Sequence, residues 1–317
     1  MKQILIISGK GGTGKTFFTG CLATALNNKV LVDCDVDAAN LHLLLHPEIK
    51  ETHDFTGGKI ASIDEAKCIQ CGACKEVCKF NAINEIFQSF QIETLKHSRS
   101  VIPSLPILCH SERQRRISSS VFQVDELSCE GCTICSYVCP EEAITLNDRI
   151  SGQYFISETR YGTLIHARLG IAQENSGKLV TKLRELAKET AQEKGCEYVV
   201  IDGPPGVGCP VMASMTGVDL VVAVTEPTLS GMHDLMRVIE LSKHFNIPVK
   251  VVINKHDLNT EMSSQIVKAV ESSGIEVCGK IPFSEDILAS VKAGKPFLEF
   301  TKNSLTKEIE ELIGKIT

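Results

Sequence analysis

The 317-residue sequence predicts an α/β fold, a doubly wound and mostly parallel sheet with an inserted small α+β domain. Short runs rich in Val and Ile recur along the chain, separated by stretches of helical length, which is typical of a parallel sheet covered on both faces. Two cysteine-rich runs interrupt this alternation. We therefore expect residues 1–59 and 151–317 to form the sheet domain and residues 60–150 to form the insert.

The expected elements follow in chain order. Strands are predicted at 2–8, 30–32, 198–201, 220–224, 249–253 and 277–281, with helices among them at 15–27, 230–245 and 260–272. The insert is not expected to supply a strand of this sheet. Because such sheets bind ligands at the carboxyl ends of their strands, a site is expected in the loops that follow these runs.

A glycine-rich loop directly follows the first predicted strand. It reads Gly9, Lys10, Gly11, Gly12, Thr13, Gly14, Lys15 and Thr16. The pattern G-x4-G-K-[ST] between a strand and a helix is typical of a phosphate-binding loop, in which backbone N–H groups and the helix N-terminus surround the phosphates. Lys15 should contact the β- and γ-phosphates of ATP, and the Thr16 hydroxyl should bind Mg²⁺. The loop thus predicts a site for ATP and its product ADP.

Eight of the fourteen cysteines repeat the spacing C-x2-C-x2-C-x3-C. The first run is Cys68, Cys71, Cys74 and Cys78, and the second is Cys129, Cys132, Cys135 and Cys139. In two-cluster ferredoxins, three cysteines of one run bind one cubane and the fourth binds the other. We therefore expect two 4Fe-4S clusters, with Cys139 completing the first site and Cys78 the second. Structural zinc is the alternative, but it leaves the C-x3-C steps unexplained.

The segment 87–119 between the two runs is rich in Ser, Arg and His and shows no clear period. We expect a disordered or loosely packed loop without chemistry of its own. A basic docking arm for an acidic partner is the alternative. Cys109 lies in this segment and matches no ligand spacing.

The string of residues 10–16 resembles the deviant Walker motif of the MinD/ParA ATPases, and most of all those MinD-like members that carry an inserted ferredoxin domain. The resemblance implies a P-loop NTPase fold like that of MinD and the nitrogenase iron protein, and a homodimer around ATP. It also implies roles for three residues. Lys10 would cross to the partner's nucleotide, Asp35 would orient the attacking water, and Asp202 would hold Mg²⁺ through water.

Further residues match the family less specifically. Asn254, Pro282 and Phe283 occupy the places of adenine contacts, although an Asn after a buried strand is commonly only a turn former. Cys209 stands where the nitrogenase iron protein places a cluster ligand, so a dimer would be able to hold a further cluster there. A packed thiol is the alternative for Cys209.

Charge and hydropathy argue against several classes of protein. With 33 Lys+Arg against 39 Asp+Glu and a net charge of −6, no nucleic-acid partner is expected. Because the sequence shows no signal peptide and no apolar stretch of about 18 residues, we expect a cytoplasmic protein whose cysteines bind metal rather than form disulfides. The apolar face of 309–316 is expected to pack on the sheet, so no stable membrane anchoring is predicted.

Together these features predict a Mg²⁺-dependent ATPase that dimerises around ATP and controls electron transfer through two clusters to a partner protein. The catalytic residues would be Lys10, Lys15, Asp35 and Asp202. Two alternatives stay open. The chain would either assemble or carry clusters for an acceptor protein, or position other components as MinD does, with the insert sensing redox state.

Overall fold

The computed structural model describes residues 1–88, 119–170 and 176–317. These residues form two compact units, one from Met1–Gly57 with Ile150–Thr317 and the other from Gly58–Arg149. Each unit contains buried apolar clusters of its own. The prediction for 89–118, which includes Cys109, concerns residues outside the described ranges.

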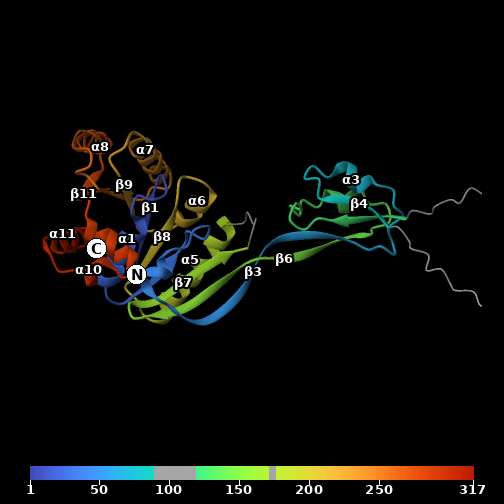
Figure 1. Cartoon of the computed structure of the whole chain (residues 1–317), viewed down its shortest axis with the longest axis horizontal. Coiled ribbons are helices and arrows are strands. Elements are labelled where there is room, and N and C mark those ends of the chain that lie inside the picture. Colours follow the sequence, from blue (N-terminus) through green and yellow to red (C-terminus); the bar gives the residue numbers. More distant parts are fainter. Residues whose placement is uncertain (89–118, 171–175) are drawn as a thin grey trace, which may run out of the picture. The chain divides into compact units, whose positions relative to one another are not determined.

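A mostly parallel sheet, nine-stranded in the described residues, forms the centre of the larger unit (Figure 1). The strand order is β11-β10-β9-β1-β8-β2-β7-β6-β3, and β6 runs antiparallel to β7 while the pairings from β7 to β11 are parallel. The strands are β1 (Lys2–Ser8), β2 (Lys29–Asp33), β3 (Glu48–Ile63), β6 (Ile144–Thr159), β7 (Gly162–Leu169), β8 (Tyr198–Pro205), β9 (Leu220–Thr225), β10 (Val249–Asn254) and β11 (Glu276–Ile281). The predicted α/β class is confirmed.

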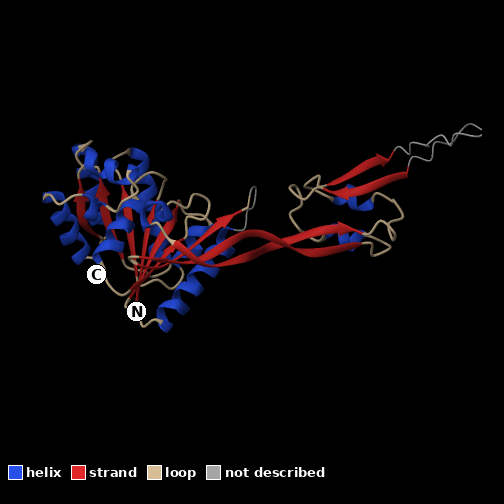
Figure 2. Cartoon of the chain, turned by 60° about the horizontal axis from the view of Figure 1, so that its bottom comes forward, coloured by secondary structure: helices blue, strands red, loops and turns tan. Residues whose placement is uncertain are grey.

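Helices cover both faces of this sheet (Figure 2). They are α1 (Lys15–Ala25), α2 (Leu41–Leu45), α5 (Ser176–Glu193), α6 (Cys209–Met215), α7 (Leu229–His244), α8 (Thr260–Ser272), α9 (Glu285–Lys292), α10 (Phe297–Phe300) and α11 (Ser304–Gly314). In β1, Ile4 and Ile6 pack with α1 and α11, whereas Leu5 and Ile7 pack with α5 to α8. This follows from the alternation of side chains along a strand.

The expectation that the cysteine-rich segment supplies no strand of the sheet is wrong at both of its ends. β3 and β6 belong to the nine-stranded sheet, and each passes from one unit into the other. β3 lies at the sheet edge and is exposed along most of its first half. Because an edge strand does not need the continuous apolar run of a buried parallel strand, the search for Val/Ile runs missed it.

The C-terminal apolar face packs as expected. Ile309, Leu312, Ile313 and Ile316 are all buried in the cluster that also holds α1. In the described ranges, no helix combines the length and apolar character needed to cross a bilayer.

The smaller unit is built from two short helices and an antiparallel pair of strands. These are α3 (Ala73–Val77), β4 (Ile83–Gln88), β5 (Ser119–Val124) and α4 (Ile134–Val138). Residues 87, 88 and 119 are therefore strand residues. The prediction of a loop over 87–119 is wrong at both of its ends. The unit's core joins Ile83 and Phe122 to Cys74 and Cys129.

Candidate functional site

The glycine-rich loop lies between the end of β1 and the start of α1. Gly12 and Gly14 have φ values of +79° and +97°, which side chains other than glycine rarely adopt. A Cβ atom on Gly9 would lie 2.2 Å from Cβ of Asp234. Because Gly14 has no side chain to cap α1, the N–H groups of the first helical turn stay available to phosphate oxygens.

Lys15 lies beside Asp35 at the centre of the site. Its Nζ is 4.0 Å from Oδ2 of Asp35, and only 6% of the lysine side chain is exposed. Burial raises the pKa of Asp35, an effect that the charge of Lys15 opposes and that of Asp37 reinforces. A carboxylate held near the phosphate-binding lysine, with its basicity raised, is suited to orienting water.

Asp202 lies inside β8, which continues to Pro205, and not at the end of the strand as expected. Its Oδ2 accepts a hydrogen bond from the Thr16 hydroxyl at 2.7 Å, and its Oδ1 accepts one from Thr19 at 3.0 Å. Burial, which leaves 1% of the residue exposed, raises the pKa of Asp202 to about 6, although both hydroxyls and Lys15 lower it.

Thr19 is a site residue that the sequence analysis missed. It follows Thr16 by three positions on α1, so both hydroxyls lie on one helix face and reach the same carboxylate. That spacing was the available signal. The Thr19 hydroxyl also lies 3.1 Å from the Lys15 carbonyl, so its one hydrogen is shared between that oxygen and the carboxylate of Asp202.

Asp33 is a second buried carboxylate, paired in register with Asp202 across β2 and β8. It accepts the N–H groups of Asp35 and Leu41, each at 3.1 Å. Burial raises the pKa of Asp33, and the negative charge of Asp202 raises it further. Asp33 therefore anchors the loop that carries Asp35.

Asn254 contacts the glycine-rich loop. Its Nδ2 donates to the Thr13 carbonyl at 2.8 Å and would lie 2.4 Å from a Cβ atom on Gly14. Asn254 also pairs in register with Ile281, so Pro282 and Phe283 follow at the same sheet edge. Phe283 is exposed, and its N–H donates to Oδ1 of Asp257 at 2.7 Å. The hydrogen bond to Thr13 shows that Asn254 stabilises the glycine-rich loop. The predicted contact of Asn254 with adenine stays a prediction.

Lys10 is held by its own chain. Its Nζ lies 2.8 Å from Oε1 of Glu226, whose Oε2 lies 3.1 Å from Nζ of Lys255. Hydroxyls of Thr228 and Ser230 lie 3.3 and 3.4 Å from the same Lys10 nitrogen. Burial alone would raise the pKa of Glu226, but the two lysines lower it. These contacts were not expected, because they join the glycine-rich loop to the distant loop after β9 and to the start of α7.

Two cavities in the smaller unit divide the eight cysteines between them. One is lined by Cys78, Cys129, Cys132 and Cys135, and the other by Cys68, Cys71, Cys74 and Cys139. Each cavity thus takes three cysteines from one run and the fourth from the other. In the part of the chain that the structure describes, no three His, Cys, Asp or Glu side chains are grouped to hold a metal ion.

The two cysteine runs adopt the same backbone conformation. Gln70 and Gly72 have positive φ in the first run, as Gly131 and Thr133 do at the equivalent positions of the second. The fourth cysteine of each run also accepts an N–H bond at its sulfur from the residue four positions later. The pairs are Cys78 with Ala82 and Cys139 with Ala143, both at 3.3 Å. The two cysteine runs therefore share the same local backbone geometry.

The other described cysteines are scattered. Cys21, Cys34 and Cys278 are buried, Cys196 is partly buried, and Cys209 is exposed at the first position of α6.

Comparisons with known proteins cover the whole chain. The CobQ/CobB/MinD/ParA nucleotide-binding domain family matches residues 4–297. The uncharacterized protein MJ0578 of Methanocaldococcus jannaschii is 31% identical over 99% of this chain and 96% of its own length. The uncharacterized protein MJ0579 of the same organism is 25% identical over 100% of this chain and 98% of its own length. The septum site-determining protein MinD of Pyrococcus horikoshii, solved with Mg-ADP, has a similar fold, with a TM-score of 0.56 at 16% identity over 99% of this chain and 95% of that one.

Proposed function

The chain belongs to the CobQ/CobB/MinD/ParA nucleotide-binding family, and on this premise we propose that it is a Mg²⁺-dependent ATPase whose ATP-bound homodimer controls electron transfer through two 4Fe-4S clusters to a partner protein. The observation that carries the cluster part of this proposal is the division of the cysteines between two cavities. The ATPase part rests on the contacts of Lys15, Thr16 and Asp202.

In the proposed ATP complex, Lys15 would bind the β- and γ-phosphates. Thr16 and Asp202 would hold Mg²⁺, which would neutralise phosphate charge, and Thr19 would keep one oxygen of Asp202 in place. Asp35 would orient the water that attacks the γ-phosphate. This assignment is supported by the position of Asp35 beside Lys15.

Replacing Asp35 by Asn is expected to lower the rate of ATP hydrolysis about 100-fold, since the water loses a basic partner, and to leave ATP affinity within about threefold. Phosphate release and equilibrium binding of a fluorescent ATP analogue measure the two effects. Glu189→Gln, which replaces an exposed carboxylate of α5 by an amide, is the control and should hydrolyse ATP at close to the unsubstituted rate. Unchanged hydrolysis in Asp35→Asn would remove Asp35 from the mechanism.

The residues of the two cysteine cavities fit 4Fe-4S clusters. A cubane presents four irons to four thiolates, so its ligands do not have to converge on one point as those of a single ion do. Backbone N–H groups already reach Cys78 and Cys139, which is how proteins stabilise cluster sulfur. Each cluster, when bound, would carry one electron at a time.

Chain connectivity supports a link between the nucleotide site and the cysteines. The loop that carries Asp35 continues into α2, and β3 begins shortly afterwards at Glu48. β3 and β6 then continue into the unit that holds the cysteines. In the proposed switch, contacts to the γ-phosphate change this loop, and the change passes along these two strands.

The whole proposal is tested on anaerobically purified full-length protein. We expect about eight irons per chain, matched by acid-labile sulfide, and an EPR spectrum of the reduced protein that changes on addition of MgATP. Fewer than about four irons would contradict the cluster assignment. Identical spectra, together with rapid loss of iron and sulfide to an apo-ferredoxin, would instead identify a cluster carrier.

Glu226 offers a test of the role of Lys10. If Lys10 has to leave Glu226 to reach a partner's nucleotide, Glu226→Gln should make the ATP-bound dimer tighter. Because Lys10 is 29% exposed, the ion pair is weak and a two- to fivefold lower dimer Kd is expected. Lys255→Ala is the matched control, since it removes the other partner of Glu226 and leaves Lys10 bound. Analytical ultracentrifugation with MgATP measures the dimer Kd of both variants. A weaker dimer in Glu226→Gln would contradict the idea that Glu226 holds Lys10 back from the partner's nucleotide.

A further inference from the structure

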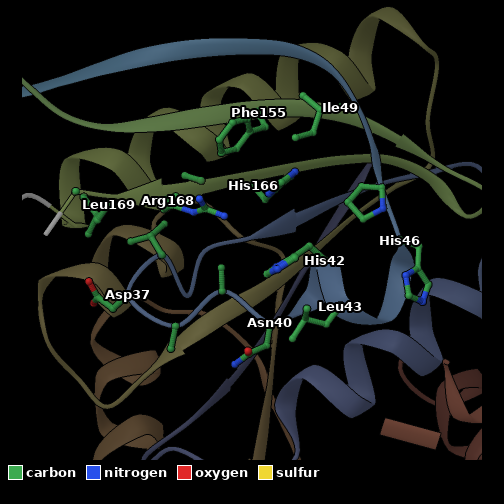
Figure 3. Close-up of a pocket in the computed structure, with 16 residues that line it drawn as sticks. Asp37, Asn40, His42, Leu43, His46, Ile49, Phe155, His166, Arg168 and Leu169 are labelled. Carbon is green, nitrogen blue, oxygen red and sulfur yellow. The ribbon is translucent and has the colours of Figure 1, made fainter. Parts of the chain in front are cut away.

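A cavity of about 920 Å³ lies in the larger unit, beside the loop that carries Asp35 (Figure 3). Its walls come from residues 36–40, from α2 and the residues that follow it, and from parts of β6 and β7. None of the residues assigned above to contact ATP or Mg²⁺ lines it. We refer to it as the α2–β7 cavity.

Basic side chains gather on one side of this cavity. Figure 3 shows His42 from α2 close to His166 and Arg168 from β7. The rings of His42 and His166 lie 6.2 Å apart and nearly parallel, at 11°. Of the lining residues, Asp37 alone is acidic, and among the described residues no carboxylate lies within ion-pair distance of Arg168. The cavity therefore favours an anion.

The two histidines add hydrogen-bonding capacity rather than fixed charge. Burial, with smaller contributions from His42 and Arg168, lowers the pKa of His166 to about 4, so His166 is neutral at pH 7. Its Nε2 is 3.0 Å from the Ser157 hydroxyl. Burial and Arg168 also lower the pKa of His42, whose buried Nδ1 has no hydrogen-bond partner in the described chain. One permanent positive charge, that of Arg168, remains.

The rest of the wall is apolar. Phe155 stacks on His166 with the ring centres 5.0 Å apart. Leu43 and Ile49 line the cavity, and 55% and 52% of these residues is exposed, so both present apolar surface to it. A ligand that carries an apolar body would cover these side chains.

We propose that the α2–β7 cavity binds a small carboxylic acid with an apolar or aromatic body, its carboxylate on Arg168 and its body against Phe155, Leu43 and Ile49. A single guanidinium matches the single charge of a carboxylate and pairs with both of its oxygens. A phosphate dianion would need more positive charge than this wall provides. The arrangement thus selects a carboxylate over a phosphate.

Occupancy of this cavity bears on ATP hydrolysis. The wall at Val36 and Asp37 directly follows Asp35, and Asp33 accepts the N–H groups of both Asp35 and Leu41, so one loop is shared by the two sites. The bound acid therefore modulates the position of Asp35. This consequence rests on the proposed ATPase function, whereas binding of the acid does not.

Calorimetric titration of the full-length protein, without nucleotide, tests the site with three probes: phenylacetate, acetate and inorganic phosphate. Phenylacetate is expected to bind at least about tenfold more tightly than acetate, because only it covers the apolar wall. Arg168→Ala should weaken phenylacetate about 10- to 100-fold, and Arg168→Lys should restore part of the loss. Arg237→Ala, which removes an exposed arginine of α7 outside the cavity, is the matched control.

The outcomes separate the two proposals. Equal affinity of Arg168→Ala and the unsubstituted protein, or tighter binding of phosphate than of phenylacetate, would overturn the carboxylate site. Thermal melting of the Arg168 variants checks that they are folded, which their exposed position predicts. If phenylacetate binds in an Arg168-dependent manner but the protein hydrolyses no ATP, the site stands and the ATPase proposal fails.

Discussion

The double variant Cys68→Ala with Cys139→Ala is expected to keep about four irons per chain, whereas Cys68→Ala with Cys78→Ala should lose nearly all of them. The reason lies in the two cavities of the smaller unit. Cys68 and Cys139 line the same cavity, so the first variant damages one cluster, while Cys68 and Cys78 line different cavities, so the second damages both. Iron and acid-labile sulfide assays on anaerobic protein measure the difference.

This pair of variants distinguishes two ways of dividing the ligands. If each run held its own cluster, the order would reverse, and the variant that lacks Cys68 and Cys78 would keep about four irons. Cys209→Ala is the matched control, because this exposed thiol lies on α6 outside both cavities. A loss of iron in Cys209→Ala would instead support a further cluster held between two chains. Zinc without acid-labile sulfide would exclude clusters.

Lys15→Ala should weaken ATP binding about 30- to 1,000-fold, which is the range expected when one partner of a buried charge pair is removed. Lys15 is almost fully buried beside Asp35, so its loss leaves that carboxylate without a positive neighbour at the place where phosphate has to bind. Calorimetry with Mg²⁺ and a non-hydrolysable ATP analogue measures the change. Lys188→Ala, an exposed substitution on α5, should leave affinity unchanged.

Lys10→Ala is expected to behave differently from Lys15→Ala. Because Lys10 contacts Glu226 and lies outside the contacts of Lys15 and Asp202, its removal should keep ATP affinity within about fivefold while abolishing the ATP-bound dimer. Sedimentation with the same analogue detects the dimer. If Lys10→Ala dimerised normally, the partner-directed role of Lys10 would have to be abandoned. If it lost ATP affinity as Lys15→Ala does, Lys10 would act within its own chain.

Several elements of this structure could be predicted from short stretches of the sequence. The strands β1, β2, β9, β10 and β11 begin and end within about one residue of the predicted runs. For β1, β2 and β9 the reason is burial, because a parallel strand covered on both faces needs a continuous apolar run. The helix α8 matches its predicted range of 260–272. The glycine-rich loop was equally readable, since Gly12 and Gly14 are required by local backbone conformation.

Contacts between residues far apart in the sequence could not be predicted from it. Glu226 meets Lys10, and Asn254 meets Thr13, only because β9, β10 and β1 lie in the same part of the sheet. Three strands of the sheet, β3, β6 and β7, escaped prediction. The residues of β3 and β6 alternate or are polar, which is permitted where a strand has an exposed face. β7 is mostly buried, but polar residues such as His166 interrupt its apolar run. The α2–β7 cavity likewise joins residues 36–49 to 155 and 166–170.

The sequence by itself determined the α/β class, the phosphate-binding loop and the two cysteine runs, because each depends on the order and spacing of neighbouring residues. Only the tertiary structure decided that Asp202 accepts hydrogen bonds from the hydroxyls of both Thr16 and Thr19, and that Lys10 forms an ion pair with Glu226. The physical reason is that local patterns constrain the backbone within a few residues, whereas a site made from distant segments depends on how the packed elements bring them together.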